Sequence, residues 1–171
     1  MKHSMNAAKC SHLILGLLAA LSATAGPKQP AQTIKAFTTA DAAISKDLTV
    51  TEDKTWLADC KQARIIRLFE VEKPDVEKCV VIYRARLKTE SFTGEAYLEM
   101  WCRFAGKGEF FSRGLANTVS GSNNWASYET PFFLKKGEKP DLIKLNLVVK
   151  GAGKVWVKDV ELLQGPLPTG Q

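Results

Sequence analysis

The chain has very little histidine: His3 and His12 are the only two, and both lie within the first twelve residues. None of its four cysteines forms a Cys-x-x-Cys pair. Structural zinc sites draw their ligands mainly from cysteine and histidine, and serine or cysteine triads need a histidine base. The sequence therefore excludes the usual zinc site and histidine-dependent hydrolysis.

Long apolar runs and long basic runs are also missing. The longest apolar run near the N-terminus, residues 13–21, has nine residues, whereas a membrane-spanning helix needs roughly 20. Lysines alternate with acidic residues, as in residues 135–139 (KKGEK), and the formal charge is only +6. These patterns predict neither membrane insertion nor a nucleic-acid partner.

The N-terminus has the features of a secretory signal peptide. Lys2 and Lys9 precede the apolar run without any acidic residue, and Ala23-Thr24-Ala25 follows it. We expect cleavage after Ala25 and export, so that the protein is secreted or periplasmic. Cleavage removes two lysines, which takes the formal charge from +6 to +4. An uncleaved short anchor is the alternative.

The rest of the chain is expected to be one β-domain. Residues 26–47 are interpreted as a leader or linker, with a short helical turn over 38–46, residues 48–163 as the domain, and 164–171 as a tail. Apolar and polar residues alternate over 79–87 and 94–104, with a turn between them, and again over 143–149. This period of two predicts an all-β, antiparallel two-sheet sandwich after a short, mostly irregular N-terminal leader.

Several segments in order resemble a known fold. They are YRARLKT at 83–89, GEAYLEMWCRF at 94–104 and VWVKDVELL at 155–163. Together they resemble a carbohydrate-binding-module-like β-jelly-roll domain of the galactose-binding-like superfamily. The resemblance implies a jelly roll that binds carbohydrate or a cell-surface polymer, and also a structural calcium ion near Asp159. Lys158 stands where such modules often have an acidic residue before the aspartate, and its positive charge opposes calcium binding. No other cofactor is expected.

A binding face is predicted on the outward side of the two central segments. Flat aromatic side chains cover the apolar faces of sugars, and charged planar groups bind hydroxyls. If 79–87 and 94–104 are neighbouring strands, an aromatic side chain and two or three charged ones converge within the footprint of one or two sugar rings, drawn from six candidates on this face. They are Trp101, Tyr97, Glu99, Arg103, Arg84 and Arg86. The alternative is a solvated face of cross-strand ion pairs with Trp101 covered by a loop.

Three functions stay open on the sequence alone. We expect an exported, non-catalytic module that binds carbohydrate or a cell-surface polymer. A structural or protein-interaction module of the same fold, without glycan affinity, is the alternative. A small hydrolase would need two acidic residues at catalytic distance in a cleft, such as Glu99 with Glu90 or Glu129.

The cysteines permit one disulfide after export. Cleavage removes Cys10 and leaves Cys60, Cys79 and Cys102. A Cys60–Cys79 bridge is preferred, because Cys102 also suits a buried core position as a free thiol. Cys79–Cys102 is the competing pair.

Overall fold

The computed structural model describes residues 30–168. Within that range all the regular secondary structure is β-strand. All strand pairs are antiparallel, which confirms the predicted class. Residues 1–25, the predicted signal peptide, lie outside the described range. No helix in residues 30–168 is long and apolar enough to cross a membrane. The strands are β1 (Gln32–Phe37), β2 (Thr49–Val50), β3 (Trp56–Cys60), β4 (Arg64–Glu72), β5 (Cys79–Phe104), β6 (Gly108–Arg113), β7 (Val119–Leu134) and β8 (Leu142–Gly165).

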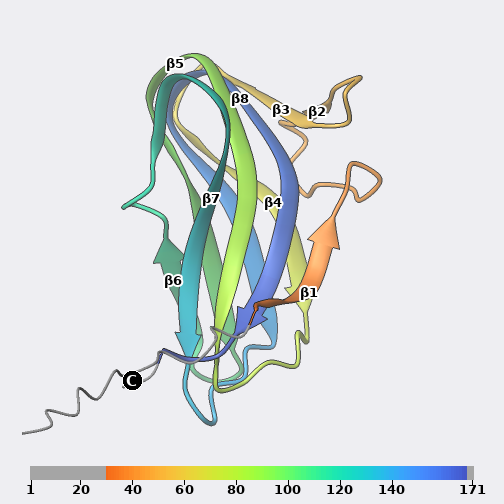
Figure 1. Ribbon diagram of the computed structural model, residues 1–171, viewed down its shortest axis with the longest axis vertical. Coiled ribbons are helices and arrows are strands. Elements are labelled where there is room, and N and C mark those ends of the chain that lie inside the picture. Colours follow the sequence, from red (N-terminus) through yellow and green to blue (C-terminus); the bar gives the residue numbers. More distant parts are fainter. Residues whose placement is uncertain (1–29, 169–171) are drawn as a thin grey trace, which may run out of the picture.

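The two longest strands, β5 and β8, pair with each other and fold over together near residues 91–94 and 151–153 (Figure 1). Ser91, Gly94 and Gly153 have positive φ angles of 48°, 96° and 125° at this fold-over. A Cβ on Gly151 would lie 1.7 Å from the Thr93 carbonyl oxygen. The fold-over therefore depends on glycine for a tight approach between the two backbones.

The fold-over divides one continuous sheet into two layers. In the first half-sheet, residues 80–90 of β5 pair with 154–165 of β8, and β7, β3 and β1 extend it. In the second half-sheet, residues 94–103 of β5 pair with 142–151 of β8, flanked by β6 and β4. The two halves form an antiparallel jelly-roll sandwich, as predicted. The predicted turn between two neighbouring strands is wrong, because 79–87 and 94–104 belong to one strand that crosses both layers.

The inward faces of both half-sheets form one apolar core. Alternate residues of β5 and β8 supply most of it, so the period of two in the sequence did identify the buried face. Every one of these side chains is at most 1% exposed: Val81, Tyr83, Ala85, Leu87, Ala96, Leu98, Met100, Cys102, Ile143, Leu145, Leu147, Val149, Val155, Val157, Val160 and Leu162.

The N-terminal segment contributes a strand that the sequence did not predict. β1 lies within the expected leader and pairs with residues 160–164 of β8. The ring of Phe37 stacks on that of Phe69 with centroids 4.0 Å apart, so β1 is anchored by apolar packing. Residues 38–48 contain turns and bends but no helical turn. At the other end, β8 continues to Gly165, two residues beyond the predicted boundary.

The three cysteines of the described chain are buried and free, so the predicted Cys60–Cys79 disulfide is absent. Cys60 pairs with Gly153 at the fold-over, whereas Cys79 pairs with Leu134 at the opposite end of the first half-sheet. The two thiols are too far apart along the strands to bond. Burial raises the pKa of all three thiols, and that of Cys102 reaches about 12.

Candidate functional site

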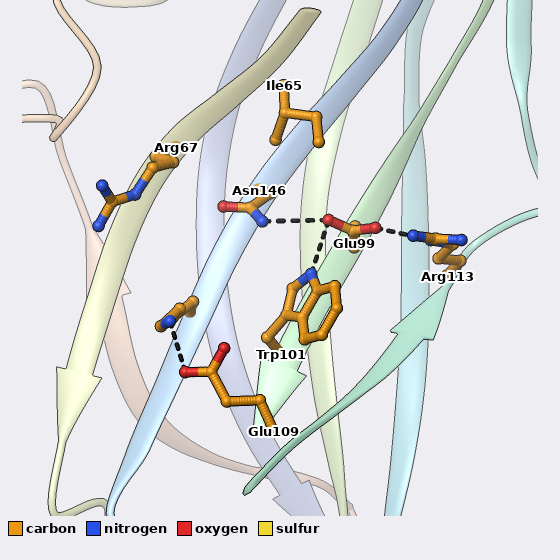
Figure 2. A pocket seen from close by; sticks show the side chains of 8 residues that line it. Ile65, Arg67, Glu99, Trp101, Glu109, Arg113 and Asn146 are labelled. Atoms are coloured by element: carbon orange, nitrogen blue, oxygen red, sulfur yellow. Dashed lines mark hydrogen bonds and ion pairs between the residues drawn. The ribbon is translucent and has the colours of Figure 1, made fainter. Parts of the chain in front are cut away.

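A hollow of about 350 Å³ opens on the outward face of the second half-sheet (Figure 2). Four adjacent strands supply two side chains each, because alternate residues of a strand point to the same face. These are Ile65 and Arg67 of β4, Lys144 and Asn146 of β8, Glu99 and Trp101 of β5, and Glu109 and Arg113 of β6. We call this the face hollow.

Glu99 forms the floor of the face hollow and is only 1% exposed. Its Oε1 accepts hydrogen bonds from Trp101 Nε1 at 2.8 Å and from Asn146 Nδ2 at 3.1 Å. Its Oε2 accepts one from Arg113 Nε at 2.6 Å. Figure 2 shows the three donors converging on this carboxylate from β5, β8 and β6. The network holds the indole in one orientation, since its only donor is used.

The carboxyl group of Glu99 is ionised at neutral pH despite its burial. Burial alone raises the pKa, but hydrogen bonds from Arg113, Trp101 and Asn146 outweigh it and lower the pKa below the ordinary 4.5. A buried charge is tolerated only when it is paired and hydrogen-bonded, as here. Glu99 is therefore a fixed anion that positions its three neighbours.

Trp101 is half-buried, and its indole ring is the aromatic surface of the face hollow. Its centroid lies 5.0 Å from that of Phe111, which is 50% exposed. The Arg113 guanidinium lies 4.2 Å from the Phe111 centroid on the same strand. Ile65, 56% exposed, adds an apolar side chain to the lining on the β4 side. The hollow thus combines a fixed indole with apolar and charged groups.

The cations that line the face hollow are already paired with carboxylates. Lys144 Nζ lies 2.5 Å from Glu109 Oε1, and Arg113 binds Glu99. Arg67 Nη2 lies 2.7 Å from Glu70 Oε1. The lining is therefore close to charge balance, and its polar groups offer both donors and acceptors to a ligand.

The structure places two of the six predicted binding residues, Trp101 and Glu99, in the face hollow. Tyr97 lies on the same face but is 3% exposed, so it offers no stacking surface; Lys150 Nζ lies 5.3 Å from its ring centroid. Arg103 also shares the face but does not line the hollow. Its guanidinium makes two 3.1 Å hydrogen bonds to Asp141.

Arg84 and Arg86 do not join this site, and the prediction that they do is wrong. Both lie on the first half-sheet, because β5 folds over between them and Trp101. Arg84 Nη2 lies 3.0 Å from Glu129 Oε2, and Arg86 Nη1 lies 3.9 Å from Asp159 Oδ2. For these two residues the alternative of cross-strand ion pairs is correct.

Six lining residues were missed by the sequence prediction. The alternation over 143–149 could have identified Lys144 and Asn146, since their neighbours are the inward residues. Arg113 lies in a short segment, FFSRG, whose residue pattern does not show which side chains face outward. The full missed set is Ile65, Arg67, Glu109, Arg113, Lys144 and Asn146.

The residues around Asp159 do not fit calcium. The Asp159 side chain is 59% exposed, and its carboxylate faces Arg86 with Lys158 adjacent in the chain. Calcium takes six to eight oxygen ligands, mostly from carboxylates and carbonyls. Within residues 30–168 no three histidine, cysteine, aspartate or glutamate side chains cluster in a way that suits a metal ion.

Comparison with known proteins identifies the fold but no sequence family. No family model matches the chain, and no curated protein matches it. The structure of the CBM22-1 and GH10 modules of Clostridium thermocellum endo-1,4-β-D-xylanase 10B, complexed with xylohexaose, aligns with a TM-score of 0.53 and 10% identity. The alignment covers 79% of this chain and 28% of that one.

A second match is the CBM22-1 xylan-binding domain of Paenibacillus barcinonensis Xyn10C. It has a TM-score of 0.48 and 10% identity over 81% of this chain and 97% of that domain. At such low identity the comparison concerns the fold alone. The chain has a β-sandwich fold, which it shares with part of the xylanase 10B structure.

Proposed function

We propose that the protein is an exported, non-catalytic module that binds carbohydrate or a cell-surface polymer through the face hollow. The observation that carries the proposal is the fixed Trp101 indole, bonded to the buried anion Glu99 inside an open hollow. Export rests on the N-terminal sequence pattern. The site residues are Trp101, Glu99, Asn146 and Arg113.

The chemistry of the face hollow suits a sugar ring. A partly exposed indole covers the apolar C–H face of a pyranose, and neighbouring amide and guanidinium groups bind its hydroxyls. Because Glu99 fixes the indole before a ligand arrives, little rotational freedom is lost on binding. The charge balance of the lining favours a neutral sugar over a strongly acidic one.

Hydrolysis is not supported by the two carboxylates of this hollow. A glycosidase needs one carboxylic acid with a raised pKa to protonate the leaving group. The pKa of Glu99 is lowered, and protein donors occupy both of its oxygens. Glu109 is held by Lys144 at 2.5 Å. Glu129, another candidate from the sequence, binds Arg84 on the other half-sheet.

A structural or protein-interaction module is the second candidate. The exposed Ile65 and Phe111 would suit contact with another protein. The polar lining around Trp101 favours the glycan instead, because an apolar protein contact would leave its amide, guanidinium, ammonium and carboxylate groups without partners, whereas sugar hydroxyls can pair with them.

The experiment is a glycan-array screen of the purified protein, followed by titration calorimetry of the ligands that it selects. Xylohexaose, present in the xylanase structure of which one part shares the fold, is the first oligosaccharide to titrate. Trp101→Ala should abolish binding. Trp125→Ala is the matched control, because Trp125 is also half-buried but lies on β7, where Lys158 covers its ring at 4.5 Å.

Loss of binding in Trp101→Ala together with retention in Trp125→Ala supports the proposal. The protein-interaction alternative predicts that no glycan binds the wild-type protein. Equal binding by wild type and Trp101→Ala would move the glycan site elsewhere and defeat the assignment to the face hollow.

A further inference from the structure

A second hollow, of about 240 Å³, lies at the edge of the sandwich where β6 and β7 are the outermost strands. Phe104, Phe110, Phe132 and Phe133 line it, with Lys107, Lys135 and Glu138 at the turns that follow β5 and β7. We call this the edge hollow. It shares no lining residue with the face hollow.

Phenylalanine rings make up the walls of the edge hollow. Phe110 and Phe133 are 51% and 42% exposed, although burying such a side chain normally stabilises a protein. Phe104 is buried beneath them, with its centroid 5.8 Å from Phe110 in an edge-to-face arrangement and 6.3 Å from Phe132. Exposed aromatic rings that cluster around a hollow indicate a binding site.

The charge at the edge hollow is positive. Neither the Lys107 nor the Lys135 ammonium group forms an ion pair with any residue between 30 and 168. The Glu138 carboxylate accepts a hydrogen bond from the Lys135 backbone N–H at 2.7 Å. The face hollow differs, because its cations are paired with carboxylates. The edge hollow therefore complements a negative charge beside an apolar group.

The ligand chemistry follows from size and lining. The volume is below the roughly 300–1,000 Å³ of pockets for drug-sized molecules, so the hollow suits a single ring with a short substituent. A sugar would bring several hydroxyls against phenylalanine walls that cannot pair with them. A flat aromatic ring gains edge-to-face contacts with Phe104 and Phe110. We propose that the edge hollow binds an aryl carboxylate, with its ring among the phenylalanines and its carboxylate at Lys107 and Lys135.

The test titrates the purified protein with cinnamate and follows backbone amide signals by two-dimensional NMR. Cinnamyl alcohol supplies the same ring without charge, hexanoate supplies the charge without a ring, and galacturonate supplies a charged sugar. We expect cinnamate to shift the signals of β6, β7 and the 135–138 turn. The alcohol should bind at least about fivefold more weakly, since two surface charge contacts contribute about 1 kcal/mol.

Two variants and two controls complete the test. Phe110→Ala should abolish cinnamate binding, and Lys107→Gln combined with Lys135→Gln should weaken it at least about fivefold. Leu115→Ala, a 55% exposed apolar residue outside the hollow, and Lys46→Gln should leave binding unchanged. Each variant's amide spectrum reports whether it is folded.

Several outcomes would overturn the proposal. Equal affinities for cinnamate and cinnamyl alcohol would show that Lys107 and Lys135 do not contribute to binding. Tighter binding of hexanoate or galacturonate would assign a different ligand class. Shifts confined to the face hollow, or no shift at all, would show that the edge hollow is not a site for aryl carboxylates. The glycan screen of the face hollow is independent of each of these results.

Discussion

Arg113 Nε lies 2.6 Å from Glu99 Oε2, and this pair joins the edge strand β6 to the floor of the face hollow. The Glu99 side chain is 2% exposed, whereas that of Arg113 is 37% exposed. The anion is thus buried under a cation that reaches solvent. The contact holds the network of Trp101 and Asn146 in place.

Replacement of Glu99 by glutamine should destabilise the protein. The amide oxygen can still accept from Trp101 and Asn146, but its NH₂ group then faces the Arg113 donor. We expect a loss of about 1–3 kcal/mol in the free energy of unfolding, less than for a fully buried pair because Arg113 is partly solvated. Urea denaturation of Glu99→Gln and wild type measures this difference, and equal midpoints would contradict the role of the pair.

The contribution of Glu99 to stability should depend on pH. Its pKa in the folded protein is lower than the ordinary 4.5. The stabilisation is therefore complete above about 4.5 and is lost as the pH falls through the folded-state pKa. The difference in unfolding free energy between wild type and Glu99→Gln should shrink from about pH 6 to about pH 3. A difference that stays constant over this range would show that Glu99 carries no depressed pKa.

How far the sequence predicts this fold can be seen from β5. Its alternation identified Val81, Leu87, Leu98 and Met100 as inward residues, because a strand puts successive side chains on opposite faces. The same pattern cannot show that the strand folds over at residues 91–94. A period of two is identical for two paired strands and for one strand that crosses two layers.

Because the sequence pattern did not reveal this fold-over, the predicted binding residues came to lie on two different half-sheets. Trp101 and Glu99 were correctly placed on one outward face, and the structure brings both into the face hollow. Arg84 and Arg86 were assigned to that face through the wrong pairing. Asn146 and Arg113 come from strands whose position beside β5 depends on long-range pairing, which local patterns do not specify.

Replacement of Gly151 by alanine should disrupt the fold-over. The new Cβ would lie 1.7 Å from the Thr93 carbonyl oxygen, so two paired backbones must separate. We expect a loss of at least about 3 kcal/mol, or no cooperative unfolding transition at all. Gly114→Ala is the control, since its Cβ would meet its nearest atom at 3.4 Å. Thermal unfolding gives the melting temperature of each variant. Similar melting temperatures would show that the backbones at residue 151 are not too close to accept a Cβ atom.

Replacement of Tyr83 by phenylalanine should leave stability unchanged or raise it by about 1 kcal/mol. Tyr83 is fully buried, and no described residue hydrogen-bonds its hydroxyl group. A buried hydroxyl without a partner has lost its water contacts without replacement. Urea denaturation measures the effect. A loss of more than about 1 kcal/mol would show that the hydroxyl has a partner, such as an internal water molecule.

The most direct test of the proposed site follows the indole N–H signals by NMR while the protein is titrated with the oligosaccharide that the glycan screen selects. The protein has four tryptophans, and variants assign each signal. The Trp101 indole N–H should shift, because it donates to Glu99 beneath the bound sugar, while those of Trp56, Trp125 and Trp156 stay in place. A shift of Trp125 or Trp156 with Trp101 unmoved, or a screen that selects no glycan, would contradict the account.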